Sequence, residues 1–93
     1  MDRAAVYSVL AIELEGWRRL PYNELRSRID DPPQVRTVTL GSEVIDVEVR
    51  LYWADQRRGS IRVEAVANGP SCWRLERLME AITLTAPTGR DRS

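Results

Sequence analysis

The sequence predicts a two-layer α+β domain in which helices cover one face of a meander sheet of antiparallel strands. Apolar residues recur at helical spacing near both ends of the chain, whereas two central stretches alternate between apolar and polar residues. Turn-forming residues separate these stretches. We therefore expect the order helix, short helix, three strands and helix in one domain over residues 1–86, followed by a disordered tail over residues 87–93.

The first two elements are expected to be helical. In residues 4–19, with Asp2 as the N-cap, apolar side chains fall on one helical face at Val6, Leu10, Leu14 and Trp17. Pro21 interrupts this run, and proline suits the first turn of a second, short helix. The sequence Asp-Asp-Pro-Pro at residues 30–33 ends that helix, whose apolar stripe is Tyr22, Leu25 and Ile29.

The first hairpin is predicted from its turn. Gly41 and Ser42 suit a two-residue type II′ turn, which requires glycine at its first position. This turn sets Val38 opposite Ile45, so that apolar residues of both strands share one face. The same alternation continues along the second strand to Trp53.

Charge selects the register of the second hairpin. Residues 61–67 alternate in the same way and are connected to the previous strand by a loop over residues 54–60. A slip by two residues in one direction would set Arg50 opposite Arg62 and Glu48 opposite Glu64, and these like charges repel. The predicted cross-strand pairs are therefore Trp53–Ile61, Arg50–Glu64 and Tyr52–Arg62.

The last element is expected to be a helix. A turn at Asn68-Gly69-Pro70-Ser71 precedes an i, i+3, i+4, i+7 stripe of Leu75, Leu78, Met79 and Ile82. Residues 72–75 could instead form a short fourth strand before this helix. In the three-stranded arrangement, the open sheet edges are Val35–Leu40 and Ser60–Ala67, and neither carries a protecting proline or lysine.

Composition restricts the function. The 93 residues (10.7 kDa) correspond to one small domain with a radius of gyration of about 12 Å. The chain lacks lysine and histidine, which excludes lysine Schiff-base chemistry, imidazole catalysis and a P-loop. The formal net charge is zero, which disfavours nucleic-acid and anionic-membrane binding and slightly favours self-association.

Cys72 is the single thiol, so an internal disulfide is excluded. At the start of a helix, main-chain amides would favour its reactive thiolate. The chain has no histidine to activate it, however, and no second cysteine to resolve it. A buried structural role is therefore favoured, and a cysteine-dependent enzyme remains an alternative. We expect no metal ion and no other cofactor, because the acidic pairs at residues 30–31 and at residues 46 and 48 fit a helix end and a solvated sheet face.

The candidate interaction surface consists of aromatic and arginine side chains. Trp73 lies off the apolar stripe of the last expected helix, and with Arg74 and Arg77 it would form a patch of the kind enriched in protein interfaces. Arg57 and Arg58, in the loop between the second and third strands, are the best support for nucleic-acid binding. The order helix, three strands, helix is similar to that of double-stranded RNA-binding domains, but the lysine cluster of those domains is missing here.

Parts of the chain resemble small bacterial proteins of uncharacterised function. The resemblance rests on Leu20-Pro21-Tyr22-Asn23-Glu24-Leu25, a Leu-Pro-Tyr-x-Glu-Leu motif at a helix start, together with Tyr52–Asp55 and Ile61–Val63. It implies a small α+β fold and supplies no activity. We therefore expect a soluble, cytoplasmic, non-enzymatic domain that forms a homo-oligomer such as a dimer or binds a protein partner, with nucleic-acid binding as the alternative.

Overall fold

The computed structural model describes residues 3–55, 57–70 and 75–86. Two helices precede four strands, which form one antiparallel sheet in the order β1-β2-β3-β4. The α+β class predicted from the sequence is thus confirmed. The elements are α1 (Arg3–Arg18), α2 (Tyr22–Ser27), β1 (Gln34–Leu40), β2 (Glu43–Trp53), β3 (Ser60–Pro70) and β4 (Leu75–Thr85).

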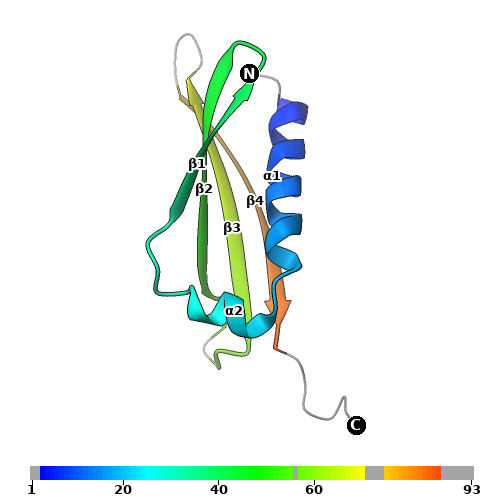
Figure 1. Ribbon diagram of the computed structural model, residues 1–93, viewed down its shortest axis with the longest axis vertical. Helices are drawn as coiled ribbons and strands as arrows, with labels where there is room; N and C mark the ends of the chain where they lie inside the picture. The colour runs from blue at the N-terminus through cyan, green and yellow to red at the C-terminus, as the bar shows by residue number, and fades with distance from the viewer. Residues whose placement is uncertain (1–2, 56, 71–74, 87–93) are drawn as a thin grey trace.

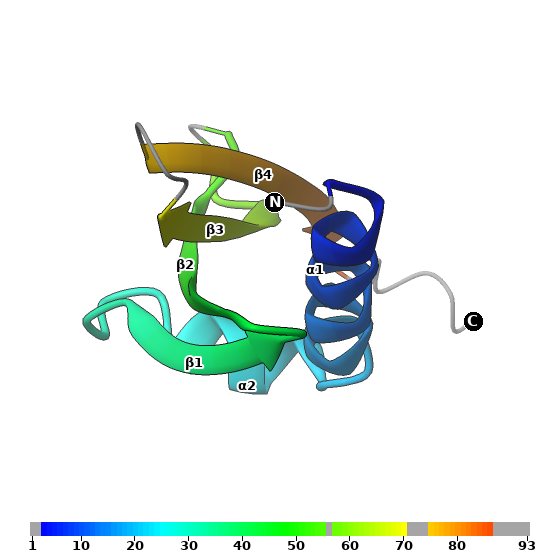
Figure 2. The same ribbon diagram turned by 90° about the horizontal axis from the view of Figure 1, so that it is seen from above.

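The sheet is strongly curled, and both helices lie on its concave side (Figures 1 and 2). α1 runs along the sheet and packs chiefly against β4 and β3. α2 lies across one end of the sheet, near the loop that joins β2 to β3 (Figure 1). The convex face carries no element of the described chain (Figure 2).

The core forms between α1 and the concave face of the sheet. The predicted helical stripe is confirmed, because Val6, Leu10, Leu14 and Trp17 are the buried residues of α1. They pack against alternate residues of β2 and β3. Leu25 of α2 is also buried, and its predicted neighbours Tyr22 and Ile29 pack against the same core. The buried residues of the sheet in this core are Ile45, Val47, Val49, Ile61, Val63, Ala65, Ala67 and Leu78.

Both predicted hairpin registers are confirmed. Val38 lies opposite Ile45, and Gly41 has the positive φ of 61° that the first position of a type II′ turn requires. In the second hairpin Trp53 lies opposite Ile61 and Arg50 opposite Glu64. Arg50 and Glu64 do not form an ion pair, however, because the Arg50 guanidinium binds Glu48 on its own strand at 2.9 Å.

The prediction of a final helix was wrong, since residues 75–85 form the strand β4. The expected turn at Asn68-Gly69-Pro70 was also wrong, because these three residues continue β3. In the strand, Leu78 and Ile82 lie opposite Ala67 and Val63 on the concave face. Two residues four apart share a face in a helix and also in a strand. The spacing of Leu78 and Ile82 therefore fits both structures.

β4 also changes the edges of the sheet. β3 lies inside the sheet, so the prediction that Ser60–Ala67 is an edge was wrong, and the two edges are β1 and β4. The radius of gyration is 15.2 Å rather than the expected value near 12 Å, because three strands of 11 residues run along one elongated molecule.

Candidate functional site

The structure does not bring the predicted arginines together. Arg77 is an exposed residue of β4 opposite Asn68, at the end of the sheet remote from α2. Arg57 and Arg58 are exposed in the loop between β2 and β3, at the end of the sheet near α2 (Figure 1). The remaining predicted residues, Trp73 and Arg74, lie outside the described residues, as does Cys72.

The fold differs from the one on which both alternative functions depend. The helix whose amides were expected to activate Cys72 is the strand β4 from residue 75 onward. The order helix, three strands, helix is replaced by two helices and four strands, so the similarity in order to double-stranded RNA-binding domains does not hold. Neither alternative function therefore gains support from the fold.

The hydrogen-bonding direction of each β4 residue follows from one contact. The Ala86 amide donates to the Gly59 carbonyl at 2.7 Å, and the pairing between β3 and β4 continues in unbroken register to Pro70. Because an antiparallel ladder alternates, even-numbered β4 residues direct their main-chain groups towards β3. The main-chain groups of Met79, Ala81 and Thr83 therefore point to the free edge, where no described strand pairs with them.

This free edge lies beside a groove, which we call the α1–β4 groove. Its volume is about 470 Å³, and α1 and β4 form its two walls. Ala11 on α1 and Ala81 on β4 are small, which leaves the groove open between the two elements. The lining residues are Tyr7, Ser8, Ala11, Leu14, Glu15, Arg18, Glu80, Ala81 and Ile82.

Glu80 is the unusual residue of this groove. It lies opposite Ala65 and therefore on the concave face, between the positions of Leu78 and Ile82. Within the described residues, its carboxylate takes part in no ion pair or hydrogen bond, whereas Glu15 on the opposite wall is 3.6 Å from the Arg18 guanidinium and 3.7 Å from that of Arg19. The groove thus presents one uncompensated negative charge.

On the convex face of the sheet, the charges of Glu48, Arg50, Arg62 and Glu64 are paired, whereas Arg77 of β4 has no ion pair among the described residues. Arg62 donates to the Tyr52 hydroxyl at 2.9 Å, and this hydroxyl donates to Glu64 at 3.0 Å. Arg50 binds Glu48 at 2.9 Å. Val66 also lies on this face and is buried, although alternation predicts a wet position for it; its direct cross-strand neighbours are Glu48 and Met79.

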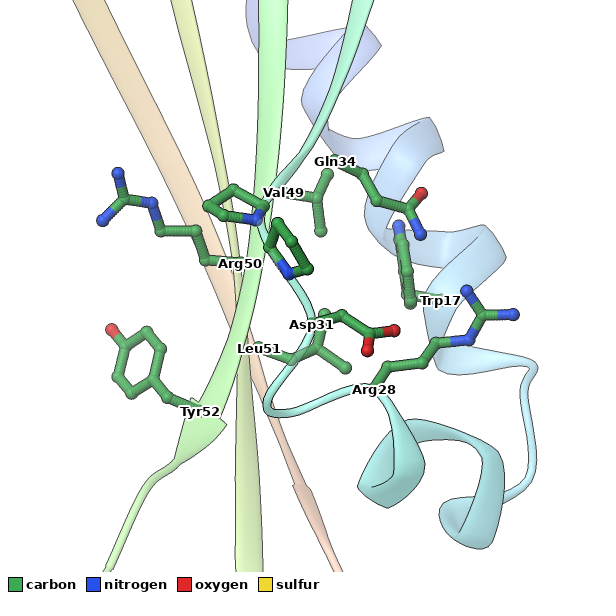
Figure 3. Close-up of a pocket in the computed structure, with 10 residues that line it drawn as sticks. Trp17, Arg28, Asp31, Gln34, Val49, Arg50, Leu51 and Tyr52 are labelled. Carbon is green, nitrogen blue, oxygen red and sulfur yellow. The ribbon is translucent and has the colours of Figure 1, made fainter.

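A second hollow of about 230 Å³, the Trp17 pocket, lies between α1, residues 31–34 and β2. Figure 3 shows Trp17, Arg28 and Gln34 on one side of β2 and Arg50 and Tyr52 on the other. The Arg28 guanidinium is 5.7 Å from the Trp17 ring centre and 2.8 Å from Glu24. Arg28 and Arg50 are each engaged within the chain, so these two cations of the pocket are not free for a ligand.

Within residues 3–55, 57–70 and 75–86, no cluster of three or more acidic or cysteine side chains has the arrangement of a metal site. In the same part of the chain, neither helix combines the length and the apolar character needed to cross a bilayer.

Sequence reasoning missed the α1–β4 groove because it assigned residues 75–82 to a helix. A signal was present at the end of that segment, where Ile82-Thr83-Leu84-Thr85 alternates and contains three β-branched residues. Reading β4 backwards from Thr85 would have placed Ile82 and Glu80 on the same face as the core.

The chain was compared with known protein families, with curated proteins and with solved structures. No family, curated protein or solved structure matched it. The resemblance to small bacterial proteins therefore remains a prediction.

Proposed function

We propose that this chain is a non-enzymatic protein-interaction domain that contacts its partner through the free edge of β4. The observation that carries this proposal is the row of main-chain groups at Met79, Ala81 and Thr83, which lies directly beside the α1–β4 groove. An extended segment of a partner could hydrogen-bond to this row and place alternate side chains in the groove, as in other cases of strand addition.

The other edge of the sheet is a weaker candidate. The same alternation gives the direction of the β1 groups. The Ala54 amide donates to the Ser60 carbonyl, so even-numbered β2 residues direct their main-chain groups towards β3 and odd-numbered ones towards β1. Odd-numbered β2 residues pair with even-numbered β1 residues, and the main-chain groups of Val35, Thr37 and Thr39 therefore point outward. Among the described pockets, the Trp17 pocket is lined by Gln34 of β1 but not by Val35, Thr37 or Thr39. A partner at β1 would gain main-chain hydrogen bonds, but the Trp17 pocket reaches only the first residue of that strand.

Binding of nucleic acid has less support. Arg50 and Arg62 of the convex face are held by carboxylates, and the whole chain has zero net charge. A nucleic acid would have to compete with these ion pairs without the help of a positive field.

The proposal is tested by blocking each edge in turn. Ala81→Pro removes a main-chain donor from the β4 edge, and Val35→Pro makes the same change on the β1 edge; each altered amide faces away from the sheet. Tagged protein is used to isolate a partner, which is then purified and titrated against the three forms. We expect Ala81→Pro to weaken the binary complex by about tenfold or more and Val35→Pro to change it by less than about twofold.

Folding of both variants is checked by circular dichroism and thermal melting. If Ala81→Pro folds normally and binds the partner as tightly as the unaltered protein, the β4 edge is not the contact surface. If Val35→Pro alone abolishes binding, the partner uses β1 instead.

A further inference from the structure

From the charge of the α1–β4 groove we infer the chemistry of the partner: an extended segment of a different protein, in which an arginine or lysine faces Glu80 and apolar residues lie two positions to either side. This inference rests on the proposed function. It adds the side-chain pattern that the β4 edge recognises.

The position of Glu80 in the strand favours a direct contact with the added segment. Its own main-chain groups point towards β3, so an antiparallel strand added at the free edge would face Glu80 at a non-hydrogen-bonded position. Side chains at such positions are the closest pairs of an antiparallel sheet. A basic residue there would approach the Glu80 carboxylate directly.

The surroundings of Glu80 specify the flanking residues. Ile82 lines the groove, and Leu78 is buried on the same face two residues before Glu80. Across the groove, Ala11 is small and Leu14 is buried. A segment with apolar, basic and apolar residues at alternate positions therefore matches β4 residue by residue.

A second copy of this chain matches less well. Glu80 is the central residue of β4 (Leu75–Thr85), so full antiparallel overlap of two such strands would set Glu80 directly opposite Glu80 of the second copy. Like charges directly opposite one another destabilise a strand pair. An inward-facing charge on an edge strand is also a common way of preventing edge-to-edge association. The same carboxylate thus favours a basic partner and opposes self-pairing.

The α1–β4 groove can be tested with designed peptides, without knowledge of the natural partner. The probe is an acetylated and amidated nonapeptide, Ser-Thr-Val-Thr-Arg-Thr-Val-Thr-Ser, and its matched forms carry Gln or Glu in place of Arg. Binding is followed by amide chemical shifts of the full-length protein. We expect the shifts to concentrate on β4 and the facing side of α1, and the Arg form to bind about threefold or more tightly than the Gln form.

A charge swap assigns this preference to Glu80. Glu80→Gln should remove the discrimination between the Arg and Gln peptides, and Glu80→Arg should reverse it in favour of the Glu peptide. A peptide N-methylated at the residues that face the edge should not bind. Glu48→Gln is the matched control, because it removes the same charge on the convex face of β2, outside the groove, and it should leave the preference for Arg in place.

The inference is overturned if the Arg peptide binds no better than the Gln peptide, if its preference survives in Glu80→Gln, or if the chemical shifts cluster on β1. These outcomes are separable from failure of the proposed function. If a natural partner no longer binds Ala81→Pro but binds Glu80→Gln normally, the β4 edge is still the contact surface. Only the inference that the partner carries a basic residue opposite Glu80 is then wrong.

Discussion

Glu13 connects α1 to the β1 side of the sheet. Its carboxylate accepts hydrogen bonds from the Arg36 guanidinium at 2.5 Å and from the Trp17 indole at 3.2 Å. Arg36 lies opposite Val47 on the concave face, at the β1 edge of the sheet. Glu13 thus neutralises one edge residue and fixes the orientation of a buried tryptophan.

Replacement of Glu13 should therefore destabilise the fold by a modest amount. Because the Arg36 side chain is 61% exposed, the ion pair itself contributes only about 0.2–1 kcal/mol. We expect Glu13→Ala to lower the free energy of unfolding by about 1–2 kcal/mol, since the indole also loses its acceptor, and Glu13→Gln to cost less. Urea denaturation measures both. Equal losses in the two variants would contradict the role of the indole hydrogen bond, and Glu15→Gln serves as the surface control.

Two glycines provide a matched test of backbone conformation. A Cβ atom would meet nothing within 4 Å at either Gly16 or Gly41, so contacts do not distinguish them. Gly16 lies in α1, where alanine should raise the free energy of unfolding by about 0.5–1 kcal/mol. Gly41 has a φ of 61°, so alanine there should lower it by about 1–2 kcal/mol. Urea denaturation of both variants checks the signs, and two effects of the same sign would contradict the assigned turn.

At the scale of elements, β4 marks the limit of what the sequence predicts. α1, α2 and both hairpin registers follow from local patterns, because one period dominates each of those segments. In β4, Leu78 and Ile82 satisfy both periods, while Glu80 interrupts the strand pattern on the concave face. Pairing with β3 decides the conformation, and such long-range contacts are invisible to a local window.

A cross-strand disulfide tests the strand β4. Arg62 lies opposite Thr83 at a position that, by the alternation of the ladder, is not hydrogen-bonded. Cα atoms at such positions are close enough for a disulfide. In a Cys72→Ser background, Arg62→Cys with Thr83→Cys should oxidise readily, lose both free thiols and melt at a higher temperature. Persistence of both thiols under mild oxidation would argue for the helix that was first expected.

The candidate site itself was less predictable than the fold. The prediction that Val35–Leu40 forms an open edge of the sheet was correct, but the second edge is β4 rather than β3. Arg77 was proposed for its side chain on a helix, whereas its relevance in the structure is its place on an edge strand. The spacing of residues along the chain predicts neither the α1–β4 groove nor the lack of an ion-pair partner for Glu80 among the described residues. Both depend on which strand α1 packs against.

At the scale of the whole molecule, the curled sheet leaves one face and two edges for partners. α1 and α2 occupy the concave side (Figure 2), and Arg50 and Arg62 of the convex face are paired with carboxylates of the chain. A charge-neutral, elongated domain of this kind can associate through main-chain groups rather than through a strong electrostatic field.

Light scattering should find a monomer. Glu80 opposes pairing of two β4 edges, so the mass should remain near 10.7 kDa across a concentration series in low and moderate salt. Glu80→Leu removes this repulsion and adds an apolar side chain at the edge, and it should shift the mass towards that of a dimer. A dimer of the unaltered protein at all concentrations would show that self-association is built into the fold and would contradict the role assigned to Glu80.

Amide hydrogen exchange along β4 is the most direct test of the free edge, because it reports each main-chain donor separately. The amides of Glu80, Ile82 and Leu84 face β3 and should exchange slowly, whereas those of Met79, Ala81 and Thr83 should exchange rapidly. Addition of a bound partner segment should slow the second set and leave the first unchanged. Uniform protection along residues 75–85, or alternation that does not respond to the partner, would contradict an interaction through the β4 edge.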